Sequence, residues 1–330
     1  MRFRDSATAS TDLRYDLEKA EEYHLLISMD TFSLGVAWNW AYDEDFVAGI
    51  ERACAERGLT TYRIDPSNVH ETHQRLLTGS LSFANFLDRA SDDDESFGPI
   101  AVMIERSPIR TFNPHEFVEH AKDKATMHLE LITKGLQVPY TIIVSPYNKK
   151  REPELTLTEL AKLGRPFIIK PANTTGGGAG VVLGAESLKD VLDTRQHHKN
   201  DKYLLQETVK PKFLDGHRAW FRVLYGFGEI IPCWWNDLTH EYRRITIEEE
   251  AKYGIGVLRG MMTTIEEVCQ LDFFSSEIAL TEDGRFVVVD YVNEVCDMRL
   301  QSKHRDGVPD DIVRRIQELI AEETKKKANR

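Results

Sequence analysis

The first third of the chain alternates short apolar runs with polar stretches that carry a helical stripe. Residues 24–29 are apolar enough to predict a buried strand, and four apolar positions between residues 46 and 54 then recur at helical spacing before Gly58. Residues 59–64 predict a second strand and residues 99–104 a third. A strand, a helix and a strand in this order favour a parallel pair with a right-handed crossover. We therefore expect a small α/β domain in residues 1–112.

The middle of the chain opens with a long helical pattern. Asn113 is a good N-cap, Pro114 is tolerated at the first helical position and Gly135 is a natural end. Residues 113–135 therefore predict one helix, whose buried face would hold Val118, Ala121, Ala125 and Ile132. Beyond a polar loop, residues 167–170 predict an apolar strand.

The last third of the chain has the pattern of an antiparallel α+β unit. Short apolar runs predict strands at residues 203–206, 220–225, 229–235, 273–280 and 286–291. One helix is expected at residues 263–271, and a closing helix follows residue 308. The Asp283-Gly284 pair favours a hairpin turn between the last two strands, because type I′ turns need positive φ.

Charge and cysteine content narrow the classes of function. The 330 residues carry a formal charge of -12, so they do not supply the clustered Lys and Arg that a nucleic acid requires. Four cysteines without a C-x-x-C spacing indicate neither a disulfide framework nor a structural zinc site. No segment approaches the ~20 apolar residues needed to cross a bilayer. We expect a cytoplasmic globular protein without nucleic-acid or membrane partners, and a homodimer as the default assembly.

A glycine-rich stretch after Lys170 is the strongest chemical signal in the chain. Glycines between two short strands leave backbone N–H groups free to close onto phosphate oxygens, and a lysine at the end of an apolar strand is placed to neutralise them. The stretch has neither the Walker A pattern nor the Rossmann fingerprint. A flexible linker is the alternative. The expected phosphate-binding residues are Lys170, Thr175, Gly176, Gly177, Gly178 and Gly180.

The order of strand, lysine, glycine loop and strand resembles the ATP-grasp superfamily, in particular the RimK-like and D-alanine–D-alanine-ligase-like carboxylate–amine ligases. The entry to that family's ATP-binding lobe is similar to Asp123-Lys124 followed by Gly135-Leu136-Gln137-Val138-Pro139, and the resemblance covers residues 110–300. It implies an α/β ATP-grasp fold, α+β in the C-terminal half, with a Rossmann-like pre-ATP-grasp domain before it. It further implies an ATP-binding small lobe at residues 113–209 and a C-terminal lobe with the metal site at residues 210–330.

The resemblance also implies roles for individual residues. Lys124 and Lys170 would contact the ATP phosphates, and Asp215 the ribose hydroxyls. Residues 204–209 look like the family's hinge strand, where Gln206, Glu207 and Val209 would line the adenine. The catalytic set would be Lys170, Arg218, Arg222 and Arg299, in which Arg218 or Arg222 stabilises transferring phosphate and Arg299 pairs with a substrate carboxylate. For Asp215, Arg218 and Arg222, a surface loop and an ordinary strand charge are the alternative reading.

A metal site is expected where the last two strands meet. Glu277 and Asp290 lie on opposite arms of the predicted hairpin, and their oxygens are of the hard type that Mg²⁺ prefers. The family pattern adds Asn293 as a third ligand of Mg²⁺, two ions in all, or of Mn²⁺. Asp290 and Asn293 are three residues apart, which in a regular strand places them on opposite faces. A bulge or a strand end near Val292 would restore a common face.

The resemblance implies an ATP- and Mg²⁺-dependent ligase that forms an acyl phosphate from a carboxylate and passes it to an amine or another nucleophile, with release of ADP. Two alternatives stay open: a kinase of a small hydroxyl compound, and an ATP-binding regulatory module without turnover. The acceptor side would include His240 and Arg243. Neither the carboxylate nor the nucleophile follows from the fold, which serves many substrates.

Overall fold

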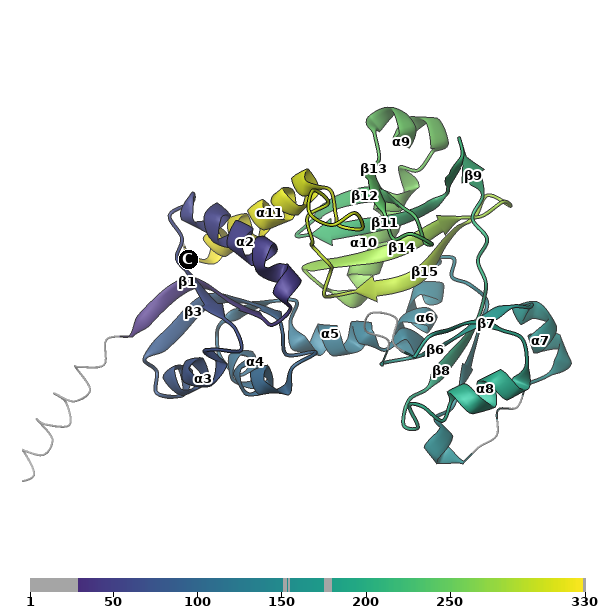
Figure 1. Ribbon diagram of the computed structural model, residues 1–330, viewed down its shortest axis with the longest axis horizontal. Helices are drawn as coiled ribbons and strands as arrows, with labels where there is room; N and C mark the ends of the chain where they lie inside the picture. The colour runs from purple at the N-terminus through teal and green to yellow at the C-terminus, as the bar shows by residue number, and fades with distance from the viewer. Residues whose placement is uncertain (1–28, 151–152, 154, 175–179, 329–330) are drawn as a thin grey trace, which may run out of the picture.

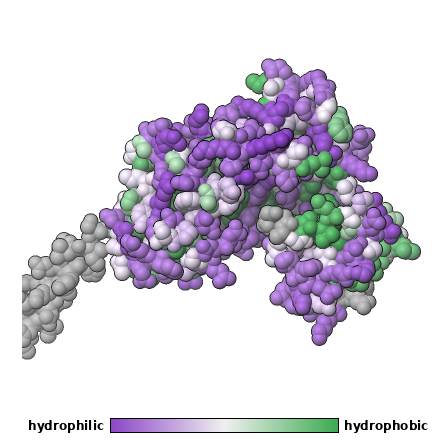
Figure 2. All heavy atoms as spheres, viewed as in Figure 1, coloured by the Kyte–Doolittle hydropathy of each residue, from purple (hydrophilic) through white to green (hydrophobic). Residues whose placement is uncertain are grey.

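The structure is a computed structural model that describes residues 29–150, 153, 155–174 and 180–328. Figure 1 shows three larger sheets, one at the N-terminal end and two side by side in the rest of the chain. No helix in these residues is both long enough and apolar enough to cross a membrane. In Figure 2 most of the visible face is hydrophilic, and apolar side chains gather where the two later sheets approach each other.

The N-terminal sheet has four parallel strands in the order β2-β1-β3-β4. The strands are β1 (Asp30–Trp38), β2 (Thr61–Ile64), β3 (Leu81–Arg89) and β4 (Arg110–Phe112), and the helices between them are α2 (Glu44–Ala55), α3 (Val69–Leu77) and α4 (Gly98–Glu105). The parallel pair expected around the first helix is therefore confirmed. Its first strand begins at Asp30, whereas the predicted strand 24–29 lies outside the described residues except for Met29.

The predicted strand at residues 99–104 is wrong, because these residues form α4. Pro99 stands in the first turn of this helix, and Ile100 and Ile104 are buried one helical turn apart. A short apolar run has no periodicity that separates a buried strand from a buried helix, so proline at the helix start was the better signal. Strand β3, which the sequence pattern missed, fills the sheet instead.

The predicted helix 113–135 is wrong as a single element, because it is broken at Asp123 into α5 (His115–Lys122) and α6 (Lys124–Thr133). The Asp123 carboxylate caps α6 by accepting hydrogen bonds from the backbone N–H of Ala125 at 3.0 Å and of Thr126 at 3.2 Å. Asn113 does not cap α5; its side chain binds the backbone of Phe273 instead. On the predicted buried face Ala121 and Ala125 are buried and Val118 partly so, whereas Ile132 is exposed.

The small lobe is the antiparallel sheet β5-β8-β6-β7 with two short helices. It consists of β5 (Thr141–Val144), α7 (Leu157–Leu163), β6 (Phe167–Pro171), β7 (Val182–Ala185), α8 (Leu188–Thr194) and β8 (Tyr203–Glu207). Its core forms around Phe167, Ile169, Tyr203 and Leu205, which are fully buried between sheet and helices. The predicted strands 167–170 and 203–206 are thus confirmed.

The largest sheet is antiparallel, with the order β13-β12-β11-β14-β15. Its strands are β11 (Trp220–Gly226), β12 (Glu229–Trp235), β13 (Tyr242–Arg244), β14 (Phe273–Leu280) and β15 (Phe286–Asn293). The short strands β9 (Phe213–Leu214) and β10 (His217–Arg218) precede it, and α9 (Ile247–Tyr253) and α10 (Val257–Cys269) connect β13 to β14. The predicted hairpin is confirmed, with Gly284 at φ +83°. The type I′ turn is wrong, because Asp283 does not have positive φ and Thr281 pairs with Arg285 around a three-residue turn.

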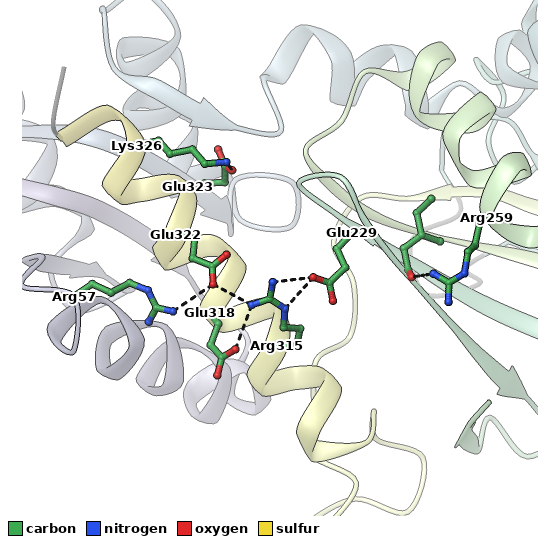
Figure 3. A network of polar contacts seen from close by, with 9 residues as sticks. Arg57, Glu229, Arg259, Arg315, Glu318, Glu322, Glu323 and Lys326 are labelled. Atoms are coloured by element: carbon green, nitrogen blue, oxygen red, sulfur yellow. Dashed lines mark hydrogen bonds and ion pairs between the residues drawn. The ribbon is translucent and has the colours of Figure 1, made fainter. Parts of the chain in front are cut away.

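Helix α11 (Asp310–Ala328) joins the N-terminal sheet to the five-stranded sheet. Its apolar stripe, Ile312, Ile316 and Ile320, is completely buried in the core that the two units share. Figure 3 shows its polar side, where Arg315 reaches Glu229 of β12 at 2.8 Å and Glu322 at 3.0 Å, while Arg57, in the turn after α2, reaches Glu322 at 3.4 Å. Helix α11 therefore packs against both the N-terminal unit and the five-stranded sheet and holds them together.

Candidate active site

Two lysines from separate motifs converge on β15. The ammonium of Lys124 lies 3.7 Å from an Asp290 carboxylate oxygen. The ammonium of Lys170 donates to the Val289 carbonyl at 3.3 Å and lies 5.2 Å from the centre of the Tyr291 ring. Lys124 takes this position because it is the first residue of α6, and its backbone N–H donates to the Ala172 carbonyl just after β6. The structure thus brings together the two lysines that the sequence placed 46 positions apart.

Lys170 is buried, and its charge responds to that burial. It is the penultimate residue of β6, and it is only 6% exposed. Burial lowers its pKa to about 8, although the negative charge of Asp290 works in the opposite direction. The ammonium has already lost most of its hydration in the folded protein. An anion that approaches it therefore stabilises its charged form. The position suits a phosphate-binding cation.

The acids of β14 and β15 face each other across the hairpin. Glu277 and Asp290 are direct partners in the ladder, and Ser275 is opposite Asn293. Two steps along β14 therefore correspond to three along β15, and the ladder shifts register on both sides of Glu277. This irregularity is the bulge that the three-residue spacing required, since it returns Asp290 and Asn293 to the face of Glu277.

Arg222 of β11 holds this acidic face together. Its Nη1 donates to Glu277 at 2.6 Å, and its Nε donates to the Ser275 hydroxyl at 3.2 Å. With the Asn293 amide oriented to place oxygen towards the guanidinium, that oxygen accepts from Arg222 Nη2. The second oxygen of Glu277 accepts from the Trp220 indole at 3.1 Å. Arg222 therefore fixes two of the three expected metal ligands.

The two carboxyl groups have opposite electrostatic settings. Burial raises the pKa of Glu277, and the nearby charge of Asp290 raises it further, while Arg222 opposes both. Burial also acts to raise the pKa of Asp290, but Lys124, Lys170 and Arg222 together hold it below the ordinary value. Burial acts to lower the pKa of Arg222, yet its acidic neighbours raise it above the usual range, so the guanidinium stays charged. The cluster combines three cations with two acids.

The donor set fits a hard divalent cation. Two carboxylates and one amide oxygen on a common face leave further coordination positions for phosphate oxygens and water, as Mg²⁺ prefers. In residues 29–150, 153, 155–174 and 180–328, this site included, no group of three or more His, Cys, Asp and Glu side chains is arranged to hold a metal, and the candidate set has two acids and an asparagine. Glu277, Asp290 and Asn293 therefore stay the predicted ligand set, with the pairing of the strands as its geometric basis.

The hinge residues are already hydrogen-bonded within the protein. The buried Gln206 amide donates to the Thr141 hydroxyl at 3.1 Å and to the Tyr291 hydroxyl at 3.0 Å. A Glu207 carboxylate oxygen accepts from the backbone N–H of Tyr140 at 2.8 Å. Val209 is partly buried against the core beneath α11. Gln206 and Glu207 thus tie β8 to β5 and to β15.

A buried polar network beneath Lys170 was not foreseen from the sequence. Tyr291 carries the ring that faces the Lys170 ammonium, and its hydroxyl lies 2.7 Å from His128 Nδ1 as well as near Gln206. Burial and the charge of Lys170 lower the pKa of His128 to about 4, so the imidazole is neutral at pH 7. The available signal was that His128 lies four residues, one helical turn, after Lys124.

The start of the glycine loop is fixed by Asp201. Its carboxylate accepts from the backbone N–H groups of Asn173 at 2.8 Å and Thr174 at 3.2 Å, and from both of their side chains. Gly180 has φ +73°, and a Cβ there would come within 3.0 Å of His198. The predicted phosphate contacts Thr175, Gly176, Gly177 and Gly178 lie outside the described residues. Asp201 was not recognised in the sequence, because nothing nearby marks it as a loop anchor.

Three other predicted site residues are engaged elsewhere. Asp215 stands at φ +47° in the turn between β9 and β10, where it accepts from Tyr253 at 2.6 Å and pairs with Lys252. Arg218 forms two parallel bonds to Asp237, at 2.6 and 2.7 Å. Arg299 pairs with Asp297 at 2.7 Å and Asp306 at 2.8 Å. The structure does not bring these three side chains into contact with the lysine and acid cluster.

The aromatic run of β12 is packed with its neighbours. Trp234 and Trp235 are both buried, and the His240 ring stacks on Trp235 at 5.3 Å. Arg243 lies over the Trp234 ring and pairs with Glu249 at 2.7 Å. The two residues expected on the acceptor side therefore have partners within the fold.

Comparison with known proteins supports the fold through structure alone. No protein-family model matches the chain, and no curated protein matches its sequence. A RimK-domain ATP-grasp protein from Sphaerobacter thermophilus DSM 20745 superposes with a TM-score of 0.58 at 17% identity, over 88% of this chain and 98% of that one. The ATP-grasp ligase PsnB, with minimal precursor, Mg and ADP, gives 0.59 at 16% identity, over 92% and 100%. The D-alanine–D-alanine ligase from Bacillus anthracis, complexed with ATP, gives 0.60 at 12% identity, over 90% and 98%.

These similarities extend over 88–92% of this chain and 98–100% of each of the three solved structures. At such low identity they speak for architecture. The chain has the ATP-grasp fold, of the α/β class.

Proposed function

We propose that the protein is an ATP- and Mg²⁺-dependent ligase that activates a carboxylate as an acyl phosphate and passes it to an amine or a related nucleophile. The observation that carries this proposal is the meeting of Lys124, Lys170 and Arg222 around Glu277 and Asp290. Binding a triphosphate and neutralising its transferring group needs this combination of cations with metal ligands. In this reading residues 113–209 supply the phosphate side and residues 210–330 the metal side.

The metal would be held by Glu277, Asp290 and Asn293. When bound, Mg²⁺ would supply positive charge that neutralises the phosphate oxygens. Two features of the fold prepare this set: the β15 bulge that brings Asn293 onto the shared face, and the Arg222 bonds that fix the orientation of Glu277. The solved PsnB complex contains Mg and ADP, and the B. anthracis ligase was solved with ATP, which supports the same pair of ligands here.

The residues of the chain would position the reactants and balance charge. A carboxylate oxygen of the substrate attacks the γ-phosphorus, the bond to the ADP oxygen breaks, and the acyl phosphate forms. Lys124 and Lys170 neutralise the transferring phosphoryl group, and Tyr291 with His128 keeps the Lys170 ammonium in place. The nucleophile then attacks the acyl carbon and phosphate leaves. This chemistry needs positioning and charge stabilisation but no covalent intermediate on the protein.

Hydroxylamine trapping tests the proposal directly. The purified chain is incubated with ATP, Mg²⁺, hydroxylamine and pools of amino acids, dipeptides and small carboxylates, and hydroxamate and ADP are measured. We expect carboxylate-dependent hydroxamate with equal ADP, lost in Lys170→Met and kept in Lys189→Met, whose lysine lies exposed on α8 with Asp193 as partner. A phosphorylated hydroxyl compound without hydroxamate would establish a kinase instead. ATP binding without turnover across the pools would establish a regulatory module.

A further inference from the structure

A pocket of 810 Å³ opens at the carboxyl ends of β3 and β4. Its walls come from α4, from α5 and from Glu294 and Val295, which directly follow β15. The volume lies within the ~300–1,000 Å³ range of small-molecule sites. The apolar side chains of Ile104, Ile109 and Phe117 line part of it, so it can contact methylene groups as well as charges.

The pocket adjoins the candidate active site. Glu294 follows the expected metal ligand Asn293, and Lys122 of the pocket lies two residues before Lys124. All strands of the N-terminal sheet are parallel, so their carboxyl ends meet at this one edge. Ligands of open α/β sheets bind outside this edge. A molecule in the pocket would therefore lie next to the cluster at which the acyl phosphate is proposed to form.

The lining of the pocket is strongly acidic. Seven Asp and Glu side chains contribute to it, against three Lys and Arg. Each of the three cations is already neutralised: Arg89 binds Asp43 at 2.7 Å, Arg110 binds Glu323 at 3.1 Å, and Lys122 pairs with Asp92 and Glu119. The paired cations leave no positive charge free to bind an anionic ligand.

Two carboxyl groups of the lining, those of Glu105 and Glu116, form no ion pair or side-chain hydrogen bond with any residue that the structure describes. Glu105 is on α4 and Glu116 on α5, so two separate elements contribute carboxyl groups to one space. Acidic side chains that only keep a protein soluble can lie anywhere on its surface. They do not need to line one pocket together with apolar side chains. The arrangement suits a flexible molecule with more than one positive charge.

We propose that this pocket binds the amine substrate of the ligase, and that this substrate is a di- or polyamine-type cation, with ammonium groups separated by methylene chains. The inference rests on the proposed function. One amino group, in its neutral form, attacks the acyl carbon; the C–N bond forms, the C–O bond to phosphate breaks, and phosphate departs with the electron pair while the amine proton passes to phosphate or water. The remaining ammonium groups stay with Glu105 and Glu116 and align the attacking end.

Calorimetric titration of the full chain with matched amines tests the pocket. The probes are 1,4-diaminobutane, spermidine and, as a single-charge counterpart of the same length, butylamine. We expect the diamine to bind about tenfold more tightly than butylamine, and the double variant Glu105→Gln/Glu116→Gln to lose that advantage. The matched control is Glu56→Gln/Glu248→Gln, which removes two exposed acids outside the pocket lining. Equal affinities for the amines, or equal losses in the two double variants, would overturn the inference.

The hydroxamate assay, run on the same preparations, separates this inference from the proposed function. Hydroxylamine does not need the pocket, so hydroxamate should form in the Glu105→Gln/Glu116→Gln variant while diamine-dependent phosphate release falls about tenfold at subsaturating diamine. Hydroxamate formation without any preference for the diamine would support the proposed ligase activity and contradict the polyamine-type substrate. Diamine binding without hydroxamate from any carboxylate pool would overturn the proposed function and, with it, the acceptor role of the pocket.

Discussion

Two charge networks of the protein use the same residue types and have different consequences. Around β15, the charges of Lys124, Lys170 and Arg222 meet those of Glu277 and Asp290 in a largely buried space, and the pKa values of the acids and of Lys170 are displaced. Along α11, Arg315 links Glu229, Glu318 and Glu322 with one-third or more of each side chain exposed (Figure 3). The two networks differ in burial rather than in the number of ion pairs. The buried charges around β15 can act on a ligand, whereas the exposed ion pairs along α11 only link neighbouring elements.

Removing a cation from the buried network should have the largest effect on activity. Lys170→Met keeps the unbranched stem of the side chain and deletes the ammonium that faces Asp290 and Tyr291. Because that ammonium is proposed to stabilise the transferring phosphoryl group, we expect kcat/KM for ATP to fall by at least about 100-fold. Steady-state phosphate release measures this, and a variant within threefold of the wild type would contradict the proposed role.

Removing Arg222 should have the largest effect on stability. Arg222→Met leaves the Glu277 carboxyl group, 18% exposed, without its 2.6 Å partner, and it also frees Ser275 and Asn293. Breaking a buried pair from one side typically costs about 3–5 kcal/mol of unfolding free energy. Urea denaturation monitored by tryptophan fluorescence measures the loss. A cost below 1 kcal/mol would mean that solvent or another cation already compensates Glu277.

The polar support beneath Lys170 can be tested without changing charge. Tyr291→Phe keeps the ring under the ammonium and leaves His128 Nδ1 and the Gln206 amide without the hydroxyl they share. Unsatisfied buried polar groups cost about 1–3 kcal/mol, so we expect a loss in that range together with a higher KM for ATP at nearly unchanged kcat. Phe286→Leu, far along the same strand, serves as a control for general loosening of β15. A lowered kcat with unaltered KM would argue against a positioning role.

The buried lysine also predicts a pH dependence. The pKa of Lys170 is lowered to about 8, so between pH 8 and the ordinary lysine value the unfolded chain binds more protons than the folded one at this residue. The contribution of Lys170 to stability therefore rises with pH across this window, while ATP affinity falls above pH 8 as the ammonium loses its proton. Denaturation curves and ATP titrations at pH 7, 8, 9 and 10 measure both trends. Lys170→Met should show neither, and an unchanged slope in that variant would assign the trends to another group.

The exposed network should have the smallest effect. Arg315→Gln removes the guanidinium that contacts three glutamates, yet water can replace each contact. We expect a loss of about 0.5–1 kcal/mol at low salt, shrinking in 0.5 M NaCl, and no change in turnover. Thermal denaturation at two salt concentrations measures it. A loss of unfolding free energy that is independent of salt and as large as that of Arg222→Met would contradict the difference between the two networks.

The parts that sequence could foresee were those with local signals. The Asp283-Gly284 pair marks the hairpin, and the hairpin brings the strand of Glu277 beside the strand of Asp290. The exact pairing of the two acids also needs the register shift between Glu277 and Ile278. The need for a bulge at Asn293 followed from strand periodicity. By contrast, α4 was mistaken for a strand because an apolar run of six residues fits either element.

The parts that sequence could not foresee depend on contacts between distant segments. Asp201, which follows β7 and α8 in the chain, anchors the start of the glycine loop. Tyr291 of β15 contacts His128 of α6. No local sequence pattern marks any of these residues as a partner of the other. Arg218 and Arg299 looked like phosphate or carboxylate ligands, but nearby aspartates already pair with them. Which arginine has a partner is a property of the fold, not of the motif that contains it.

Oxygen transfer from the carboxylate tests the central claim most directly. A carboxylate that forms hydroxamate is labelled with ¹⁸O in both oxygens, incubated with the protein, ATP, Mg²⁺ and an amine, and the released phosphate is analysed by mass spectrometry. Activation as an acyl phosphate predicts one ¹⁸O atom in each phosphate formed, because the carboxylate oxygen that attacked phosphorus leaves with it. Phosphate without label, at a rate equal to product formation, would contradict the account.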